Sequence, residues 1–223
     1  MHRRRPLLAS SIGTKLLIGA SGLGLVGYLF IHIAGNLVVF AGPAAYNKYA
    51  FTLESQAVLP LIELALLVVF LAHAVNAIRM YLANRQARPA AYVVKRPAGP
   101  PSRKSFASST MILSGLWLVA FLVIHVRAFR EGWGTEYEWP AGGRDLYRQE
   151  MEVFSNPLMV AFYVLSMTVV GTHLWHGITS GCQSLGLDIA SPRARLAGKA
   201  VATLVAGGFA FIAIWAYVTG GGQ

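Results

Sequence analysis

Apolar residues dominate five long stretches of the 223-residue chain. A run of roughly 20 apolar residues forms a helix long enough to cross a hydrocarbon core about 30 Å thick. The stretches lie at approximately 16–40, 57–82, 108–129, 157–182 and 196–219. We therefore predict an all-α membrane protein, organised as one membrane domain over residues 1–223, in which five helices span the bilayer.

Two helix boundaries are also visible in the pattern. Pro157 directly after Asn156 is typical of a first helical residue behind a capping residue, and Gly186 is typical of a helix end. The apolar run that follows Met1 to Lys15 is longer than a signal-peptide core of roughly 7–15 residues. It is therefore expected to be a retained membrane anchor.

Composition supports a bilayer as the solvent. Hydrophobic residues make up 55% of the chain and charged residues only 13%, which argues against an ordinary soluble domain. Cys182 is the single cysteine, so an intramolecular disulfide and a cysteine ligand set for zinc or an iron–sulfur cluster are both excluded. Any metal chemistry must involve histidine or a cofactor.

The distribution of charge predicts the orientation. Of the 19 lysines and arginines, 14 lie before the first span or in the 79–104 and 193–199 connections. By the positive-inside rule the N-terminus is cytoplasmic and the C-terminus is outside. The 79–104 connection should be an irregular loop that contacts lipid headgroups or a soluble partner, and we expect no nucleic-acid partner. The 131–152 loop holds six of the nine acidic residues, which fits an external, water-exposed connection.

Histidine is the candidate chemistry. Apart from His2, every histidine lies inside a predicted span, at positions His32, His73, His125, His173 and His176. Ionisable side chains at such depth are costly and indicate function by default. A single one could be a hydrogen-bonded packing residue, but four different spans each supply at least one.

Depth sorts these histidines into two levels. At 1.5 Å per residue, His32 lies about 25 Å above Lys15, near the outer side. His125 follows Ser105 by about 20 residues and reaches a similar level. His73 and His173 come about 15 residues after the outer ends of their spans, which places both in the inner half. The prediction is an outer pair, His32 with His125, and an inner pair, His73 with His173.

Two imidazoles from different helices at each level match the ligation of a flat macrocycle between helices. Two haems b, about 15–20 Å apart, are the natural count. Zinc would require further ligands at each level. A proton relay would require carboxylates at matching depth, and Glu63 is the one that the sequence indicates is buried enough.

Several further residues are candidates to surround such cofactors. Asn76 and His176 each follow an inner-pair histidine by three residues and could bond a propionate, a quinone oxygen or a backbone carbonyl. Arg79, Arg127 and Arg130 could pair with propionates, or they could be ordinary arginines that extend to the membrane surface. Gly35, one turn after His32, leaves space for a haem edge or for a neighbouring helix.

Three segments resemble one known family. "HIAGNLVVFAGPAAYNKYA" (32–50), "LPLIELALLVVFLAHAVNAIRM" and "GTHLWHG" are similar to the cytochrome b558 membrane subunit of succinate:quinone oxidoreductase, and the similarity extends over all five spans. The resemblance implies five helices, the first four forming a haem-binding bundle, two haems b and a single anchor polypeptide. It also implies the cytoplasmic membrane of a bacterium.

Carried onto this chain, the resemblance makes His32 and His125 ligands of the distal haem iron, and His73 and His173 ligands of the proximal one. His176 would lie behind the ligands or beside the quinone. The implied partners are a flavoprotein with FAD and an iron–sulfur subunit. Because the chain has no dinucleotide motif and no cysteine ligand set, we expect it to contain no catalytic residue for succinate itself.

The implied reaction is electron transfer from the cytoplasmic side through both haems to quinone, with menaquinone expected on family grounds. Quinone could bind at the inner surface near His176. It could also bind near the distal haem, where Glu63 would exchange protons. Glu63 does not match the family's spacing, and a buried Glu63 could instead stay protonated and bond a neighbouring helix.

Two other functions remain open from the sequence. The chain could be a di-haem cytochrome b of another dehydrogenase, of the fumarate reductase, hydrogenase or formate dehydrogenase type, which would differ in its co-purifying partner. It could also be a haem-free transporter or scaffold, although inverted repeats are not evident.

Overall fold

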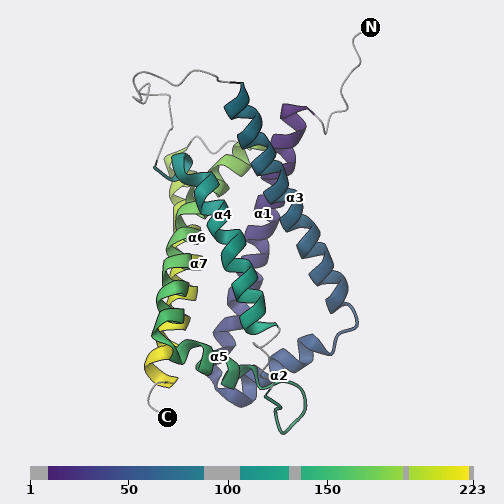
Figure 1. Ribbon diagram of the computed structural model, residues 1–223, viewed down its shortest axis with the longest axis vertical. Coiled ribbons are helices and arrows are strands. Elements are labelled where there is room, and N and C mark those ends of the chain that lie inside the picture. The colour runs from purple at the N-terminus through teal and green to yellow at the C-terminus, as the bar shows by residue number, and fades with distance from the viewer. Residues whose placement is uncertain (1–9, 88–105, 131–136, 188–190, 221–223) are drawn as a thin grey trace.

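A computed structural model describes residues 10–87, 106–130, 137–187 and 191–220, and its ordered segments are helices (Figure 1). In chain order they are α1 (Ser11–Asn36), the 3-10 helix η2 (Leu37–Ala41), α2 (Pro43–Glu54), α3 (Leu59–Gln86), α4 (Phe106–Phe129), α5 (Leu146–Ser155), α6 (Pro157–Ser184) and α7 (Pro192–Gly220). In the described ranges the one β-type pairing is an isolated bridge between Glu138 and Arg144.

Five of these helices are long and apolar enough to cross a membrane, which confirms the predicted all-α class and the number of spans. They cover Ser11–Ala41, Leu59–Gln86, Ser108–Phe129, Pro157–Ser184 and Arg193–Gly220. The spans run side by side, and the described chain begins and ends at opposite ends of the bundle (Figure 1). The chain is therefore a multi-pass membrane protein in its architecture.

The helix boundaries follow from local capping. The Ser10 side chain accepts a hydrogen bond from the Gly13 amide at 3.0 Å, which satisfies one of the free N–H groups at the start of α1. Asn156 accepts from the Leu158 amide at 2.9 Å, with Pro157 as the first residue of α6, as predicted. Gly186 has a φ of 77° just after α6, also as predicted, and this conformation is open to glycine at little cost.

Two short helices lie at one end of the bundle, where we had predicted plain connections. α2 and α5 pack against each other beside the C-terminal end of α4 (Figure 1). We call this the α2–α5 end. The sequence-based view of 131–152 as a water-exposed loop is wrong for its last part, because this part is helical and α5 buries Gln149 and Glu150. Much of the 79–104 connection lies outside the described residues, and its start is helical as far as Gln86.

The core lies mainly between α6 and α7, with α1 and α4 covering it. The residues of its largest cluster are Met167, Val170, Leu174, Ala202, Val205 and Ala206. The Trp117 indole donates to the buried Ser166 hydroxyl at 3.0 Å, which joins α4 to α6 in mid-span. α3 packs chiefly against α1 and has no buried residue.

Candidate functional site: two pairs of histidines

The first pair lies toward the α2–α5 end. His32 of α1 and His125 of α4 have ring centres 5.8 Å apart and ring planes at 85°. Aromatic rings flank both side chains: Tyr28 stacks on His32 at 5.4 Å, and Phe121 stacks on His125 at 5.5 Å. The pair is therefore enclosed by apolar and aromatic groups.

Hydrogen bonds hold both members of this pair. His125 Nδ1 lies 3.2 Å from the Tyr163 hydroxyl of α6. Asn36 Nδ2 donates to the His32 carbonyl at 2.8 Å and lies 3.4 Å from His32 Nδ1. The orientation of each ring is thus set by a residue on its own or a neighbouring helix.

The second pair lies farther from the α2–α5 end. His73 of α3 and His173 of α6 have ring centres 6.5 Å apart and ring planes at 73°. His73 Nδ1 is 3.1 Å from the Ile18 carbonyl oxygen, and His173 Nδ1 is 2.9 Å from the Ser114 hydroxyl. The structure therefore brings together the two pairs that depth along the helices predicted.

The hydrogen bonds of the four rings share one feature. Throughout the described ranges, each recorded hydrogen bond of these rings is made by Nδ1 and not by Nε2. A carbonyl oxygen only accepts, so the bond to Ile18 places a proton on His73 Nδ1 and, in the neutral ring, leaves the lone pair on Nε2. A carbonyl oxygen that accepts from the ring nitrogen facing away from the metal is a usual companion of a histidine that binds metal.

The spacing of the rings can be compared with metal ligation. Bonds between a metal and an imidazole nitrogen are about 2.0–2.1 Å, so two rings on opposite sides of one ion have centres roughly 6 Å apart. The separations of 5.8 Å and 6.5 Å fall on either side of this value. The described residues contain no group of three or more His, Cys, Asp or Glu side chains that could hold a metal ion. The donor set is thus two separate histidine pairs, which suits an ion whose remaining ligands come from a macrocycle.

Glycines allow close approach at two places beside these pairs. A Cβ at Gly22 of α1 would lie 3.0 Å from His73 Cε1, so a larger residue would push the ring away. A Cβ at Gly35 would clash with the Tyr49 hydroxyl. The space predicted next to His32 at Gly35 is therefore filled by Tyr49 of α2.

The other residues predicted around the inner pair are less engaged. Asn76 Nδ2 donates to the Ala72 carbonyl of its own helix at 2.7 Å. Of the partners predicted for Asn76, a propionate, a quinone oxygen or a backbone carbonyl, it therefore bonds the last. His176 is partly buried on α6, and Arg79 is exposed on α3. Arg127, which was predicted beside His125 of the outer pair, lies exposed in the last turn of α4.

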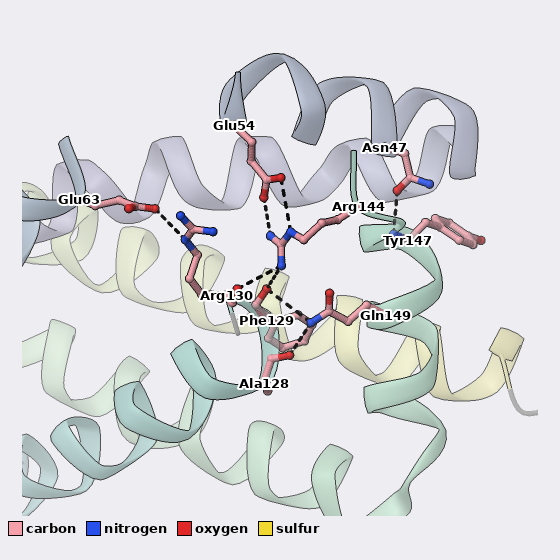
Figure 2. Close-up of polar contacts among 9 residues, drawn as sticks. All are labelled: Asn47, Glu54, Glu63, Ala128, Phe129, Arg130, Arg144, Tyr147 and Gln149. Carbon is pink, nitrogen blue, oxygen red and sulfur yellow. Dashed lines mark hydrogen bonds and ion pairs between the residues drawn. The ribbon is translucent and has the colours of Figure 1, made fainter. Parts of the chain in front are cut away.

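Glu63 is not a buried carboxylate. Its side chain is 43% exposed in the described chain and pairs with Arg130, with 3.0 Å between Arg130 Nε and Glu63 Oε1 (Figure 2). The sequence-based view that Glu63 is buried is therefore wrong. Its position one turn into α3 leaves it at the surface of the α2–α5 end, where Arg130 reaches it from just beyond α4.

A polar cluster fixes the C-terminal end of α4 to α2 and α5 (Figure 2). Arg144 forms an ion pair with Glu54 of α2 and donates to the Phe129 carbonyl at 3.0 Å. Gln149 of α5 donates to the Ala128 carbonyl at 2.6 Å. These bonds satisfy carbonyls that have no partner within the helix, only a few residues after His125.

Asn47 fastens α2 to the start of α5. Its amide nitrogen donates to the Asp145 carboxylate at 2.8 Å, and its amide oxygen accepts from the Tyr147 backbone N–H at 2.9 Å. Asn47 is fully buried. Because both halves of the amide are used, its replacement by an apolar residue would remove the Asn47 partner of the Tyr147 backbone N–H and leave Asp145 Oδ1 with its bond from the Arg148 N–H.

Glu150 is the buried acid at this end. It is 2% exposed, and its Oε2 accepts a hydrogen bond of 2.7 Å from the Tyr46 hydroxyl of α2. Its Oε1 has no partner among the described atoms. Burial raises the pKa of Glu150 to about 7, against a smaller lowering by the Tyr46 hydrogen bond, and burial also raises the pKa of Tyr46.

Sequence reasoning missed the residues that support the pairs, which are Ser114, Tyr163, Tyr46 and Glu150. A signal existed for Glu150: the apolar residues of LYRQEMEVFS recur at helical spacing, and α5 is strongly amphipathic. No pattern in the sequence could have connected Ser114 to His173, because that contact depends on the packing of α4 against α6.

The helices and the site together define a class: a helical membrane protein with two histidine pairs between its spans. A stretch of 60 residues is 42% identical to the succinate dehydrogenase hydrophobic membrane anchor subunit of Halobacterium salinarum. The matched stretch is 27% of this chain and 46% of the relative, so less than half of the curated relative is covered. This identity supports a relationship to the succinate dehydrogenase membrane anchors. No protein-family profile and no solved structure matches the chain.

Proposed function

We propose that this chain is the membrane anchor and di-haem cytochrome b subunit of a succinate:quinone oxidoreductase. It would pass electrons from an iron–sulfur subunit through two haems b to quinone, with menaquinone as the preferred substrate. A flavoprotein subunit with FAD would oxidise succinate. The observation that carries the proposal is the presence of two histidine pairs at ligating separations in a chain related in sequence to a succinate dehydrogenase anchor.

In this proposal His32 and His125 hold the distal haem, and His73 and His173 hold the proximal one. Each bound haem supplies an iron that takes up and releases one electron at a time. The chain orients the four imidazoles through Nδ1 and provides a surrounding of low polarity that tunes the potentials. α3 has no buried residue, which suits a helix covered by cofactor and lipid rather than by protein.

The accessory residues keep their proposed roles on the basis of position. Arg79 and Arg127 are exposed near the ends of their helices, within reach of membrane-surface propionates. Arg130 would have to exchange its pairing with Glu63 for a propionate. Asn76 would have to release the Ala72 carbonyl to bond any cofactor, and His176 shares its helical face with His173.

Quinone binding is proposed at one of two places. An open hollow of about 450 Å³ beside the His32 level is lined by Phe30, Ile31, Ala34, Gly35 and Tyr49, a size within the usual range for small-molecule sites. Glu63 lies at the same end of the bundle and could exchange protons there. The alternative is the opposite end, near His176.

Purification of the tagged chain from its native membranes tests the proposal. We expect a flavoprotein and an iron–sulfur protein to co-purify, and succinate to reduce the haem of the complex. Malonate, which cannot be oxidised in the same way, is the matched control and should leave the haem oxidised. Co-purification with a hydrogenase or formate dehydrogenase instead, or haem that succinate does not reduce, would contradict the proposed partner.

A further inference from the structure

A chain of polar contacts leads from the buried acid to the first histidine pair. The Tyr46 hydroxyl lies 2.7 Å from Glu150 Oε2 and 3.5 Å from Asn36 Oδ1. Asn36 in turn donates to the His32 carbonyl and lies against His32 Nδ1. Four residues from α5, α2 and α1 thus form one connected path, and none of the resemblance-based assignments includes Glu150 or Tyr46.

A phenol hydroxyl has a single proton, so Tyr46 can donate to only one acceptor at a time. When Glu150 is ionised, the short contact to its carboxylate takes that proton, and Asn36 Oδ1 keeps only the long contact. When Glu150 takes up a proton from water, its carboxyl group can donate to the Tyr46 oxygen, and the phenol proton can turn to Asn36 Oδ1. The charge on Glu150 therefore decides how Asn36 is held, and Asn36 contacts His32 directly.

We propose that Glu150 is a proton-responsive positioning residue that acts through Tyr46 and Asn36 on His32. The orphaned Oε1 supports this, because a buried carboxylate oxygen without a hydrogen bond destabilises the ionised form and so favours proton uptake by Glu150. In its effect on redox potential the inference rests on the proposed function. An electron added between His32 and His125 would then strengthen proton binding at Glu150, and by linkage a proton on Glu150 would favour reduction.

Among the groups that surround it, Glu150 is the one whose charge changes most near neutral pH. From α2 it faces Tyr46, and from α6 the Tyr163 hydroxyl, which bonds His125 of α4. The parts of α7 packed against α5 are apolar. Burial sets the pKa of Glu150 at about 7, so both charge states are populated near neutral pH.

Redox potentiometry of the purified complex at about pH 6, 7 and 8, on either side of that pKa, tests the inference. We expect one of the two haem potentials to fall as pH rises. Glu150→Gln should abolish this dependence, and Tyr46→Phe should abolish or strongly reduce it while Glu150 is still present. Glu152→Gln, a change of an exposed acid on the same helix, is the matched control and should keep the dependence.

A second measurement does not need bound haem. In the full-length chain labelled with ¹⁵N-histidine, the His32 resonance should shift with pH across the neutral range, and the shift should disappear in Glu150→Gln. If both haems are bound and neither potential depends on pH, or if the dependence survives Glu150→Gln, the inference fails and the proposed function stands. If haem is absent but the His32 resonance still shifts with the charge on Glu150, the proposed function fails and the positioning role stands. If haem is absent and the His32 resonance does not shift, both fail.

Discussion

The four paired histidines are held in place by atoms that belong to this chain. A carbonyl oxygen, two hydroxyl groups and an amide contact the Nδ1 atoms, each from a helix packed beside the ring or from the ring's own helix. A polar side chain inside a membrane helix is stabilised only when its hydrogen-bonding groups are satisfied. The support of each ring therefore explains how an imidazole can be kept in an apolar bundle.

Single histidine replacements test the pairing. We expect His125→Ala to remove the distal haem and leave the proximal one, and His73→Ala to do the reverse, because each ion would lose one of its two axial ligands. Haem per chain should fall by about half in each variant, with different spectral components lost. His176→Ala is the control and should retain both haems. Loss of both haems from either single variant would contradict two independent pairs.

The buried Glu150 predicts a pH-dependent stability. Its pKa is raised from 4.5 to about 7 in the folded protein, so between these values the folded state binds the proton more tightly than the unfolded state. The free energy of unfolding should therefore fall as pH rises from about 4.5 to about 7, by roughly 3 kcal/mol in total.

Thermal unfolding of the chain in detergent at several pH values measures this effect. Glu150→Gln stays neutral throughout, so its unfolding temperature should vary less across the same range. An unchanged pH dependence in Glu150→Gln would show that Glu150 is not the group responsible.

Among the elements, α5 connects the surface helices to the bundle. Its polar face reaches the end of α4 through Gln149 (Figure 2). It reaches α2 through Glu150, while its apolar face packs on α7. The end of α4 bears His125, so the position of that ring depends on how α5 is seated.

Gln149→Ala tests this dependence. Removal of the amide would leave the buried Ala128 carbonyl without its partner and should destabilise the protein by about 1–3 kcal/mol. The last turn of α4 should exchange its amide hydrogens faster, and the distal haem should be lost more readily than the proximal one. Arg148→Ala, which changes an exposed neighbour over the Tyr137 ring, should have an effect within about 0.5 kcal/mol. Equal effects of the two changes would contradict the role of α5.

The sequence predicted the five membrane-spanning helices, because a helix that crosses lipid needs a long run of apolar residues. Each span is fixed by a run of apolar residues, and the helical rise then places the histidines in depth without any knowledge of packing. α2, α5 and the burial of Glu150 depend instead on contacts between residues about 100 positions apart, as in Tyr46 with Glu150. Glu63 shows the opposite error, because a carboxylate in an apolar run can lie at a helix end and pair with Arg130 at the surface.

At the scale of the whole molecule, the charge asymmetry predicts how the bundle lies in the membrane. The five spans of the described residues predict that the two ends of the chain lie on opposite sides, and the basic connections predict that the N-terminal side faces the cytoplasm. A C-terminal fusion to alkaline phosphatase should therefore be active, and a C-terminal fusion to green fluorescent protein should be dark. The same fusions placed in the 88–105 connection should give the opposite result. A fluorescent C-terminal fusion would contradict this orientation.

The proposed function requires two iron porphyrins held between the paired histidines. A pyridine haemochrome assay on the purified chain, combined with quantitative amino-acid analysis, counts them directly. We expect a ratio of about two haems b per chain. A ratio near zero in protein that is folded and inserted in the membrane would contradict it.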